Sequence, residues 1–571
     1  ELEEKLPLAL ATAGHSEPVV IVIDGLNQVL ADGRDLRWLP WHTPPGVRLV
    51  LSVIPGECLD LLQQREWPMQ EVPLLSADLQ REVAAQYLGR FRKKLPEDLL
   101  DELVAAPPTA NPLYLKVLLD ELRVFGEHEQ LAQKLRWYLE ATTPDALYER
   151  MLTRLEEDYE GKRTGLVSEA LSLIWASRNG LSENELLELL GGENQPVLPR
   201  TTWAPLHLAL QESLALRGGR LTFFHDYLRQ AVAKRYVSDK ATVPHLHYQL
   251  ARYFGQGDEV TERMAEELPW QLAKAGAWDE LQPWLLNIDM FLKLYERGWL
   301  ELWGYWRGIR EDSGELFDLG VEYRRAINSY KENSSSSVSD ESEPDALYIN
   351  AMICIDQFLQ ESVGPRAAEP FARECLDLRL KQLGPDDPEV ALGYRNLGRI
   401  LVNMGEITEG LELLHQSAGK LLRALGPDCK PLSYVYDTIG IANADLGKYD
   451  KAIEFYNCSI DIKLKNPEQG GITAAYQLIG AAYRAKGNYD KALEYYGKAE
   501  KDSIRNLGPN DPSLAKIYDS IGLGHQEKGE FDMALEYHQK ALDIFQEQFG
   551  LEHLDTGICY GNIARLFTDT G

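Results

Sequence analysis

One carboxylate in the sequence stands where a metal ion could be held. Asp24 directly follows the apolar run Val19–Ile23, in the stretch VVIVIDGLNQ. Such a run predicts a buried strand, and the ligands of parallel sheets sit at the carboxyl ends of the strands. A carboxylate at that place can hold Mg²⁺ through a water molecule. The alternative is a plain turn, because Asp-Gly often ends a strand without any ligand.

The residues after Asp24 limit the chemistry of such a site. Asn27 and Gln28 carry amides, and an amide cannot take a proton from an attacking water at neutral pH. Asn27 and Gln28 therefore cannot serve as the general base of a hydrolytic reaction at this site.

A second strand must position the first. Val47–Ile54 is apolar and is closed by Pro55-Gly56. Two short apolar strands with a connection between them predict a parallel sheet that is buried on both faces.

The next segments are predicted to be helical. Ser76–Phe91 and Glu97–Ala105 have helix start signals, and Asn111-Pro112 opens an apolar helix that ends at Gly126.

A further group of elements has the outline of a winged helix. A helix is predicted over Thr164–Arg178, and the capping box Ser182–Glu185 starts another. Gly218-Gly219 predicts a hairpin turn, which leads into the stretch FFHD and the segment Phe223–Tyr236.

The C-terminal third repeats itself. Four stretches, among them TIGIANADLGKYDKAIEFY and LIGAAYRAKGNYDKALEYY, align on two glycines each, and the steps are 42, 40 and 42 residues. The first glycines are Gly398, Gly440, Gly480 and Gly522. In each copy this glycine should let a neighbouring helix approach closely, while the second permits a tight turn. A helix pair cannot bury its apolar face alone, so the copies must stack.

Stacked helix pairs bind partners on the face lined by the first helix of each pair. Positions three before and one, four and five after the first glycine should point to that groove. They hold Arg395, Arg399, Asn403, Asp437, Gln477, Arg484, Asp519, Gln526 and, in a cut-off fifth copy, Arg565. For a single residue the alternative is a solvated polar position. The row as a whole predicts a groove for a protein or peptide.

Two family resemblances follow from these motifs. The repeats resemble tetratricopeptide repeats, in the 42-residue form of kinesin light chain and nephrocystin-3. The N-terminal half resembles STAND-class P-loop NTPases of the NACHT/NB-ARC type, nephrocystin-3-like proteins in particular. VVIVIDGLNQ is similar to their Walker B motif, VRLVLSVIPG to their sensor-1 strand, and NPLYL and FFHD to two later motifs.

The second resemblance implies ATP or ADP with Mg as cofactor. Asp24 would orient the metal-bound water and Ser52 would lie on the sensor-1 strand. Pro112 would rest against the adenine, and His225 would reach the phosphates of bound ADP. From the residues alone, Pro112 also fits a helix start and His225 a core histidine.

The sequence departs from that family in three places. No G-x-x-x-x-G-K-[ST] stretch is present, the family's D-G-x-D-E reads Asp24-Gly25-Leu26-Asn27-Gln28, and Ile54 stands where arginine is frequent. Eighteen residues precede Val19, so the chain is expected to be a fragment whose P-loop lies upstream. Catalytic residues are not assigned, and at most slow ATPase activity is expected of the full-length protein.

The predicted fold class is mainly α, with a remnant of an α/β P-loop NTPase core, a helical lid, a winged helix and an α-solenoid. The expected boundaries are 1–75 for the core remnant, 76–160 for the lid, 161–238 for the winged helix, 239–330 for a helical segment, 331–344 for a flexible acidic and Ser-rich linker, and 345–571 for the repeats.

Composition limits the partners. The net charge of −30 disfavours nucleic acid, no apolar run approaches the roughly 18 residues of a membrane span, and the six cysteines show no C-x-x-C pair. A cytoplasmic protein is expected, and the resemblance to nephrocystin-3 implies an association with the cilium. The function predicted first is a nucleotide-gated signalling switch that senses a protein ligand and oligomerises, as in innate immunity. The alternative is a protein-interaction scaffold with a non-catalytic nucleotide fold.

Overall fold

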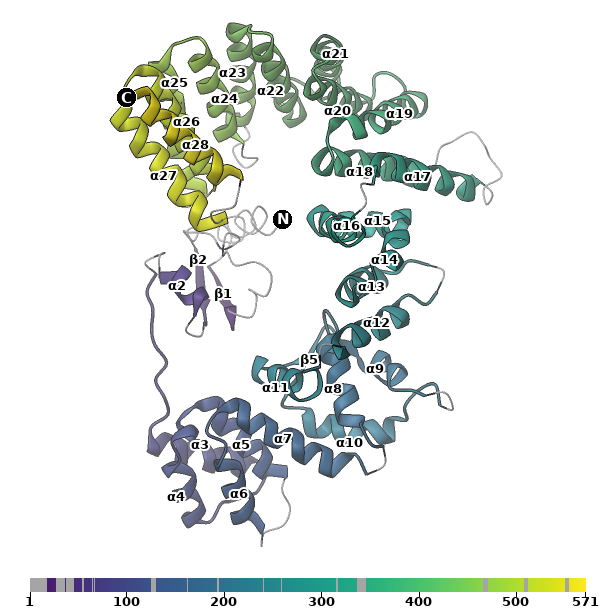
Figure 1. The fold of residues 1–571 in the computed structure, drawn as a ribbon, viewed down its shortest axis with the longest axis vertical. Coiled ribbons are helices and arrows are strands. Elements are labelled where there is room, and N and C mark those ends of the chain that lie inside the picture. The colour runs from purple at the N-terminus through teal and green to yellow at the C-terminus, as the bar shows by residue number, and fades with distance from the viewer. Residues whose placement is uncertain are drawn as a thin grey trace. The chain divides into compact units, whose positions relative to one another are not determined.

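The computed structural model is mainly helical (Figure 1). It describes residues 18–570 except 27–35, 37–38, 40–45, 54–55, 64, 66, 125–129, 162, 193–194, 240, 258, 315–316, 336–345, 466–470, 508–511 and 550–553. The predictions for Asn27, Gln28, Ile54 and Gly126 therefore lie outside the described residues. The chain divides into two compact units, one of residues 69–330 and one of residues 1–68 and 331–571.

The two strands predicted near the N-terminus form a parallel pair. Strand β1 (Val19–Ile23) pairs in register with β2 (Val47–Leu51), from Val19 opposite Val47 to Ile23 opposite Leu51. One face packs on a small core of Leu26, Leu36, Leu39, Cys58 and Leu62.

The expectation that both faces of this pair are buried is wrong. Val20, Val22 and Val50 are exposed by 61%, 68% and 53%. Alternate residues of a strand point to opposite faces, so these three share the face away from the small core.

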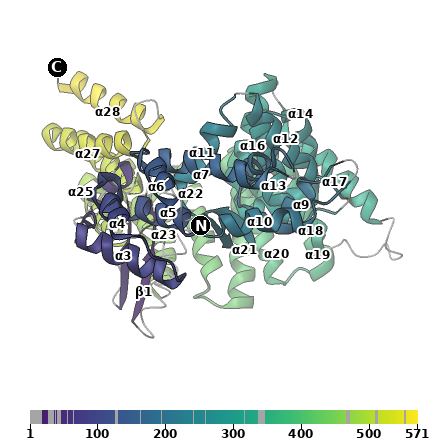
Figure 2. The same cartoon turned by 90° about the horizontal axis from the view of Figure 1, so that it is seen from below.

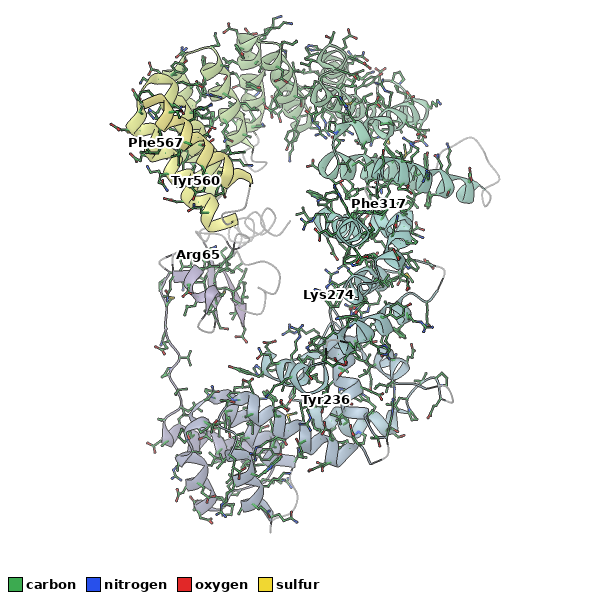
Figure 3. All side chains as sticks on the ribbon, in the orientation of Figure 1. Arg65, Tyr236, Lys274, Phe317, Tyr560 and Phe567 are labelled. Atoms are coloured by element: carbon green, nitrogen blue, oxygen red, sulfur yellow. The ribbon has the colours of Figure 1, made fainter. Side chains whose placement is uncertain are left out.

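Helix α2 (Glu57–Gln63) follows β2 and leads to Arg65, labelled in Figure 3. The Arg65 guanidinium donates to the backbone carbonyls of Leu36 and Leu39, at 2.7 Å each. Burial lowers the pKa of Arg65 to about 10. These bonds hold Leu36 and Leu39 close to the end of α2.

The second unit begins with a helical group. It comprises α3 (Ala77–Arg90), α4 (Glu97–Ala105), the 3₁₀ turn η2 (Pro107–Ala110), α5 (Pro112–Val124), α6 (Leu131–Leu139) and α7 (Pro144–Tyr159). Asn111 caps α5, because its Oδ1 accepts from the backbone N–H groups of Leu113 and Tyr114 at 2.9 and 3.2 Å. The predicted helix start at Asn111-Pro112 is thus confirmed.

A small sheet follows the helical group. The chain runs through α8 (Leu166–Ala176), β3 (Leu181–Ser182), α9 (Glu183–Leu189), α10 (Arg200–Leu210), β4 (Leu214–Arg217), β5 (Arg220–Phe223) and α11 (Asp226–Tyr236). The strands are antiparallel in the order β3-β5-β4.

The capping box and the hairpin turn that were predicted for this region are both confirmed. The capping box of Ser182 and Glu185 starts α9, and the turn between β4 and β5 holds Gly218 and Gly219 at φ 56° and 79°.

Six more helices complete this part of the chain. They are α12 (Thr242–Phe254), α13 (Glu262–Ala275), α14 (Trp278–Leu286), α15 (Ile288–Arg297), α16 (Trp299–Ser313) and α17 (Leu319–Ser335). Helix α17 occupies residues 331–335, which were expected to belong to a linker, and residues 336–344 of that linker lie outside the described residues. The stretch that was predicted to be an acidic and Ser-rich linker therefore begins inside helix α17.

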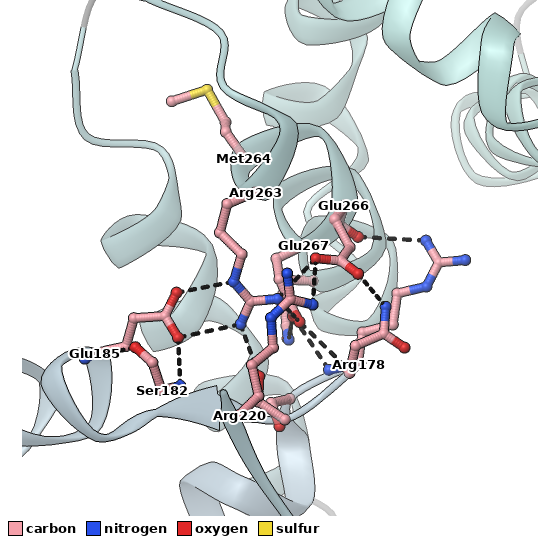
Figure 4. Close-up of polar contacts among 12 residues, drawn as sticks. Arg178, Ser182, Glu185, Arg220, Arg263, Met264, Glu266 and Glu267 are labelled. Atoms are coloured by element: carbon pink, nitrogen blue, oxygen red, sulfur yellow. Dashed lines mark hydrogen bonds and ion pairs between the residues drawn. The ribbon is translucent and has the colours of Figure 1, made fainter. Parts of the chain in front are cut away.

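A buried charge network joins α13 to the small sheet (Figure 4). Glu267 is fully buried and accepts from the backbone N–H groups of Arg178 and Asn179, at 3.1 and 3.2 Å. Arg263 bonds Glu267 at 2.9 Å and Glu185 at 2.8 Å. The network fixes the α8–β3 turn against α13.

The repeats form a series of helix pairs. The described helices are α18 (Ala346–Ser362), α19 (Pro365–Leu383), α20 (Pro388–Met404), α21 (Ile407–Leu425), α22 (Lys430–Asp445), α23 (Tyr449–Lys465), α24 (Ile472–Ala485), α25 (Tyr489–Leu507), α26 (Pro512–Lys528), α27 (Phe531–Phe549) and α28 (Leu554–Thr570). We call the even-numbered helices from α20 to α28 the A helices, and α21, α23, α25 and α27 the B helices. Figures 1 and 2 show α20 beside α21 and α27 beside α28.

The first glycine of each repeat allows the close helix approach that the sequence predicts. A Cβ added at Gly440 would lie 2.3 Å from the Tyr456 ring, and one at Gly480 would lie 2.5 Å from the Tyr496 ring. Gly398 and Gly522 face Leu414 and His538 in the same way, with added-Cβ distances of 2.9 and 2.8 Å. In all four copies the A helix therefore packs directly on a side chain of its own B helix.

Candidate functional site

The A helices form a continuous layer along the array. Each of α20, α22, α24 and α26 contacts the next A helix as well as its own B helix. Because of these contacts, side chains on the side of the A helices away from the B helices share one surface, which we call the A-helix face.

The structure sorts the polar residues that were predicted for this face. Asn403 and Arg565 are exposed, while Arg395, Arg399, Gln477 and Arg484 are half-buried. Arg484 reaches from α24 to Glu527 on α26, where their ion pair measures 2.5 Å. These six residues remain candidates for partner binding.

Two predicted residues are engaged inside the array. Asp437 pairs with Lys463 at 2.6 Å, and Lys463 is buried. Asp519 lies 2.8 Å from Nδ1 of the buried His538 and accepts from Asn562 on α28 at 2.9 Å. Both carboxylates therefore tie helices together.

The expectation that Gln526 points out of the array is wrong. Gln526 is only 8% exposed. Val402 stands at the equivalent place of the first repeat, four residues after the first glycine, and is 4% exposed. Gln526 therefore lies in a packed place like Val402, which its polar residue type conceals.

Arg395 and Arg399 lie one turn apart on α20. Arg399 donates to the amide oxygens of Gln360, on α18, and Asn396. Among the described residues, no ion pair joins either arginine to a carboxylate. Burial, followed by repulsion from Arg399, lowers the pKa of Arg395.

Asp356, on α18, lies close to this pair, since it contacts Asn396 and is influenced by the charge of Arg399. It was not among the residues predicted from the sequence. It is 1% exposed and accepts from Gln360 at 2.9 Å and from Asn396. Burial raises its pKa to about 6, against the opposing effects of both amides and of Arg399. Asp356 lies on α18, before the first repeat that carries the two glycines, so the repeat pattern does not reveal it.

The residues predicted to touch a nucleotide fall into two groups. Asp24 and Ser52 come together, since the Ser52 hydroxyl donates to the Asp24 carboxylate and accepts from the Gly25 N–H at 2.7 Å. Asp24 is exposed at the carboxyl end of β1. The pair lies at the carboxyl end of β1.

Pro112 and His225 belong to the other unit. Pro112 is exposed at the first turn of α5, and His225 is half-buried at the start of α11. Lys116, one turn after Pro112 on the same helix, lies 5.9 Å from the ring centroid of Phe224. The face of α5 that carries Pro112 is therefore turned toward the segment that carries His225. His225 is not the buried core histidine of the alternative.

Two kinds of feature are absent from the described part of the chain. No group of three or more His, Cys, Asp or Glu residues there is arranged to hold a metal ion. No helix in the same residues is both long and apolar enough to cross a membrane.

The comparison with protein families identifies the repeats. Residues 389–465, 472–539 and 517–571 match the tetratricopeptide repeat model. The C-terminal part of the chain thus carries tetratricopeptide repeats.

Curated relatives extend the similarity beyond the repeats. A TPR repeat-containing protein of Dictyostelium discoideum is 26% identical over 78% of this chain and 27% of its own length. Nephrocystin-3 of Mus musculus is 28% identical over 73% of this chain and 31% of its own length. The chain thus spans about a third or less of the length of these relatives.

Among solved structures, a STAND protein with a tetratricopeptide repeat sensor from Pyrococcus horikoshii aligns with 100% of this chain and 80% of its own. Its sequence identity is 12% and its TM-score is 0.38.

Proposed function

We propose that this chain is a protein-interaction scaffold whose repeat array docks a partner protein on the A-helix face. The observation that carries the proposal is the continuous layer of A helices, with polar side chains such as Asn403 and Gln477 turned out of the packing. Stacked helical repeats use such extended surfaces for binding. The tetratricopeptide repeat match over residues 389–571 supports the same function.

Site-specific photocrosslinking in cells tests this function. A photoreactive amino acid at Asn403, exposed on α20, is expected to capture a partner. The matched control is the same amino acid at Gln416, exposed on the B helix α21. Equal capture from both positions, or none from either, contradicts docking on the A-helix face.

A nucleotide-gated signalling switch is the second candidate function, favoured by the contact between Asp24 and Ser52. In this proposal residues 161–238 are a winged helix, consistent with the order helix, strand, two helices and hairpin. Asp24 would hold Mg²⁺ through a water molecule, and Pro112 and His225 would contact ADP. Bound Mg²⁺ would neutralise phosphate charge. In this proposal, bound ADP keeps the protein in a closed state. A ligand that binds the repeats ends that state and so allows the protein to oligomerise.

Nucleotide binding to the full-length protein tests the switch. Fluorescent ADP is expected to bind at micromolar concentration, and His225→Ala is expected to speed its release and to change oligomer size with ATP. His245→Ala is the control, because His245 is exposed on α12. If neither ADP nor ATP binds, the switch is contradicted and the scaffold remains as the proposed function.

A further inference from the structure

The two arginines of the first complete repeat have charges that the array does not neutralise. Arg395 is half-buried, and no hydrogen bond or ion pair is recorded for it among the described residues. Arg399 donates only to the amides of Gln360 and Asn396. A half-buried guanidinium that lacks an anion is costly, because burial removes part of its hydration.

The acidic residues around the pair already have other partners. Glu389, whose charge acts on Arg395, pairs with Arg379 at 3.1 Å. Asp356 is buried, accepts from Gln360 and Asn396, and has a pKa raised to about 6. None of these carboxylates lies within ion-pair distance of Arg395.

The unpaired charge contrasts with the rest of the chain. The sequence has 89 Asp and Glu residues against 59 Lys and Arg residues. At the place equivalent to Arg395, the next repeats have Asp437, Gln477 and Asp519. In the first complete repeat, Arg395 and Arg399 thus bring together two guanidinium groups without a carboxylate partner among the described residues, beside the exposed Asn403.

We propose that Arg395 and Arg399 bind an aspartate or glutamate side chain of an acidic peptide segment in the partner protein. This inference rests on the proposed docking function and specifies the chemistry of the partner. Guanidinium groups bind carboxylates through parallel N–H···O bonds. Tyr434 on α22 is 40% exposed and contributes to the electrostatic environment of Arg395. Its hydroxyl supplies a further donor to the peptide.

Local charge favours a carboxylate over a phosphate. The charge of Glu389 acts on Arg395 and that of Arg399 on Asp356, so two carboxylates lie near the arginines, and the chain carries a net charge of −30. A singly charged group matches this surrounding better than a phosphate, which carries a charge of about −1.5 to −2 at pH 7.

The test is a selection of displayed random dodecapeptides against the 571-residue chain. The expected result is enrichment of Asp and Glu, which disappears with the chain that carries both Arg395→Gln and Arg399→Gln. Arg423→Gln is the matched control, since Arg423 is exposed on the B helix α21. Thermal unfolding by circular dichroism checks that the variants are folded.

Fluorescence anisotropy then measures the best acidic peptide directly. The double variant is expected to weaken its affinity by about tenfold or more, the typical scale for losing charge-assisted bonds. A version with Gln for each Asp and Glu is expected to lose binding to the same extent, whereas a phosphoserine version is expected not to bind better.

Each other outcome has a defined meaning. Selected peptides without acidic enrichment, or with enrichment that survives in the double variant, overturn this inference while docking on the array stands. A preference for the phosphoserine peptide overturns the carboxylate assignment. Failure to select any peptide contradicts this inference, and an absence of crosslinks at Asn403 contradicts the docking function itself.

Discussion

At the residue scale, Glu267 is a buried anion that depends on its partners. It is fully buried and bonded to Arg263, Gln271 and two backbone N–H groups. Glu267→Gln removes the charge and places an amide N–H₂ among donors. We expect it to lower the free energy of unfolding by about 3–5 kcal/mol, the range for breaking a buried pair. Urea unfolding followed by circular dichroism measures the change.

Glu262 on the same helix is the matched control. Its carboxylate pairs with Lys293 but remains 75% exposed. Glu262→Gln is expected to cost about 1 kcal/mol or less. If both substitutions cost the same, burial of the network does not contribute to stability.

Asp356 predicts a pH dependence of the first repeats. Burial raises its pKa from 3.8 to about 6, so the folded state binds more protons than the unfolded state between these values. This contribution to stability is complete below pH 3.8 and is lost as pH rises through 6. A shift of two pKa units corresponds to about 3 kcal/mol, of which about 1 kcal/mol falls between pH 5 and 7.5.

Asp356→Asn removes this contribution but can still accept a hydrogen bond. The stability of the variant relative to the parent is therefore expected to increase from pH 5 to pH 7.5. Thermal unfolding at both pH values measures this difference. A difference that is constant with pH would show that Asp356 is already ionised at pH 5.

At the element scale, the first repeat glycines determine how closely an A helix approaches its B helix. Gly440→Ala would place a Cβ 2.3 Å from the Tyr456 ring, so a ring or a helix must move. We expect a loss of about 1–3 kcal/mol, the typical cost of overpacking. Gly497→Ala is the control, because nothing lies within 4 Å of its added Cβ on α25.

Gly497→Ala is expected to stabilise α25 by about 0.5–1 kcal/mol through its higher helix propensity. Chemical denaturation of both variants beside the parent measures the opposite signs. A loss of stability at Gly497 similar to that at Gly440 would mean that helix approach is not the reason for the glycine.

Local signals predicted much of the element structure. The strands at Val19 and Val47, the capping box at Ser182, the Gly218-Gly219 turn and the repeat glycines follow from residue type and spacing. These features depend on residues that are close in sequence. Their structure is determined by secondary-structure propensity and by the backbone conformations that each residue type allows.

Long-range packing determined the features that the sequence did not reveal. The exposed side of β1 and the burial of Gln526 depend on which distant segments cover a residue. The sequence analysis assigned Ser52 and Asp24 to the same site but did not predict the hydrogen bond between them. The lack of a carboxylate partner for Arg395 could not be predicted, because it requires knowing that the nearby Glu389 pairs with Arg379.

At the scale of the whole molecule, residues 69–330 form a compact unit with their own core. This segment is expected to fold when expressed alone and to unfold in one cooperative transition. A version that stops at residue 238 removes α13 and leaves the backbone N–H groups of Arg178 and Asn179 without Glu267. We expect its thermal midpoint to be lower, as measured by circular dichroism. Equal midpoints would show that the network does not stabilise the small sheet.

The contacts under the repeat glycines join residues of one copy only. Gly440 packs against Tyr456, and Gly480 packs against Tyr496. Duplication or loss of one complete repeat would therefore leave each of these contacts intact. The ion pair of Arg484 and Glu527 instead crosses from one repeat to the next. Gene recombination can therefore lengthen or shorten the array without repacking its helix pairs, while the bonds at each new junction must be acquired afresh.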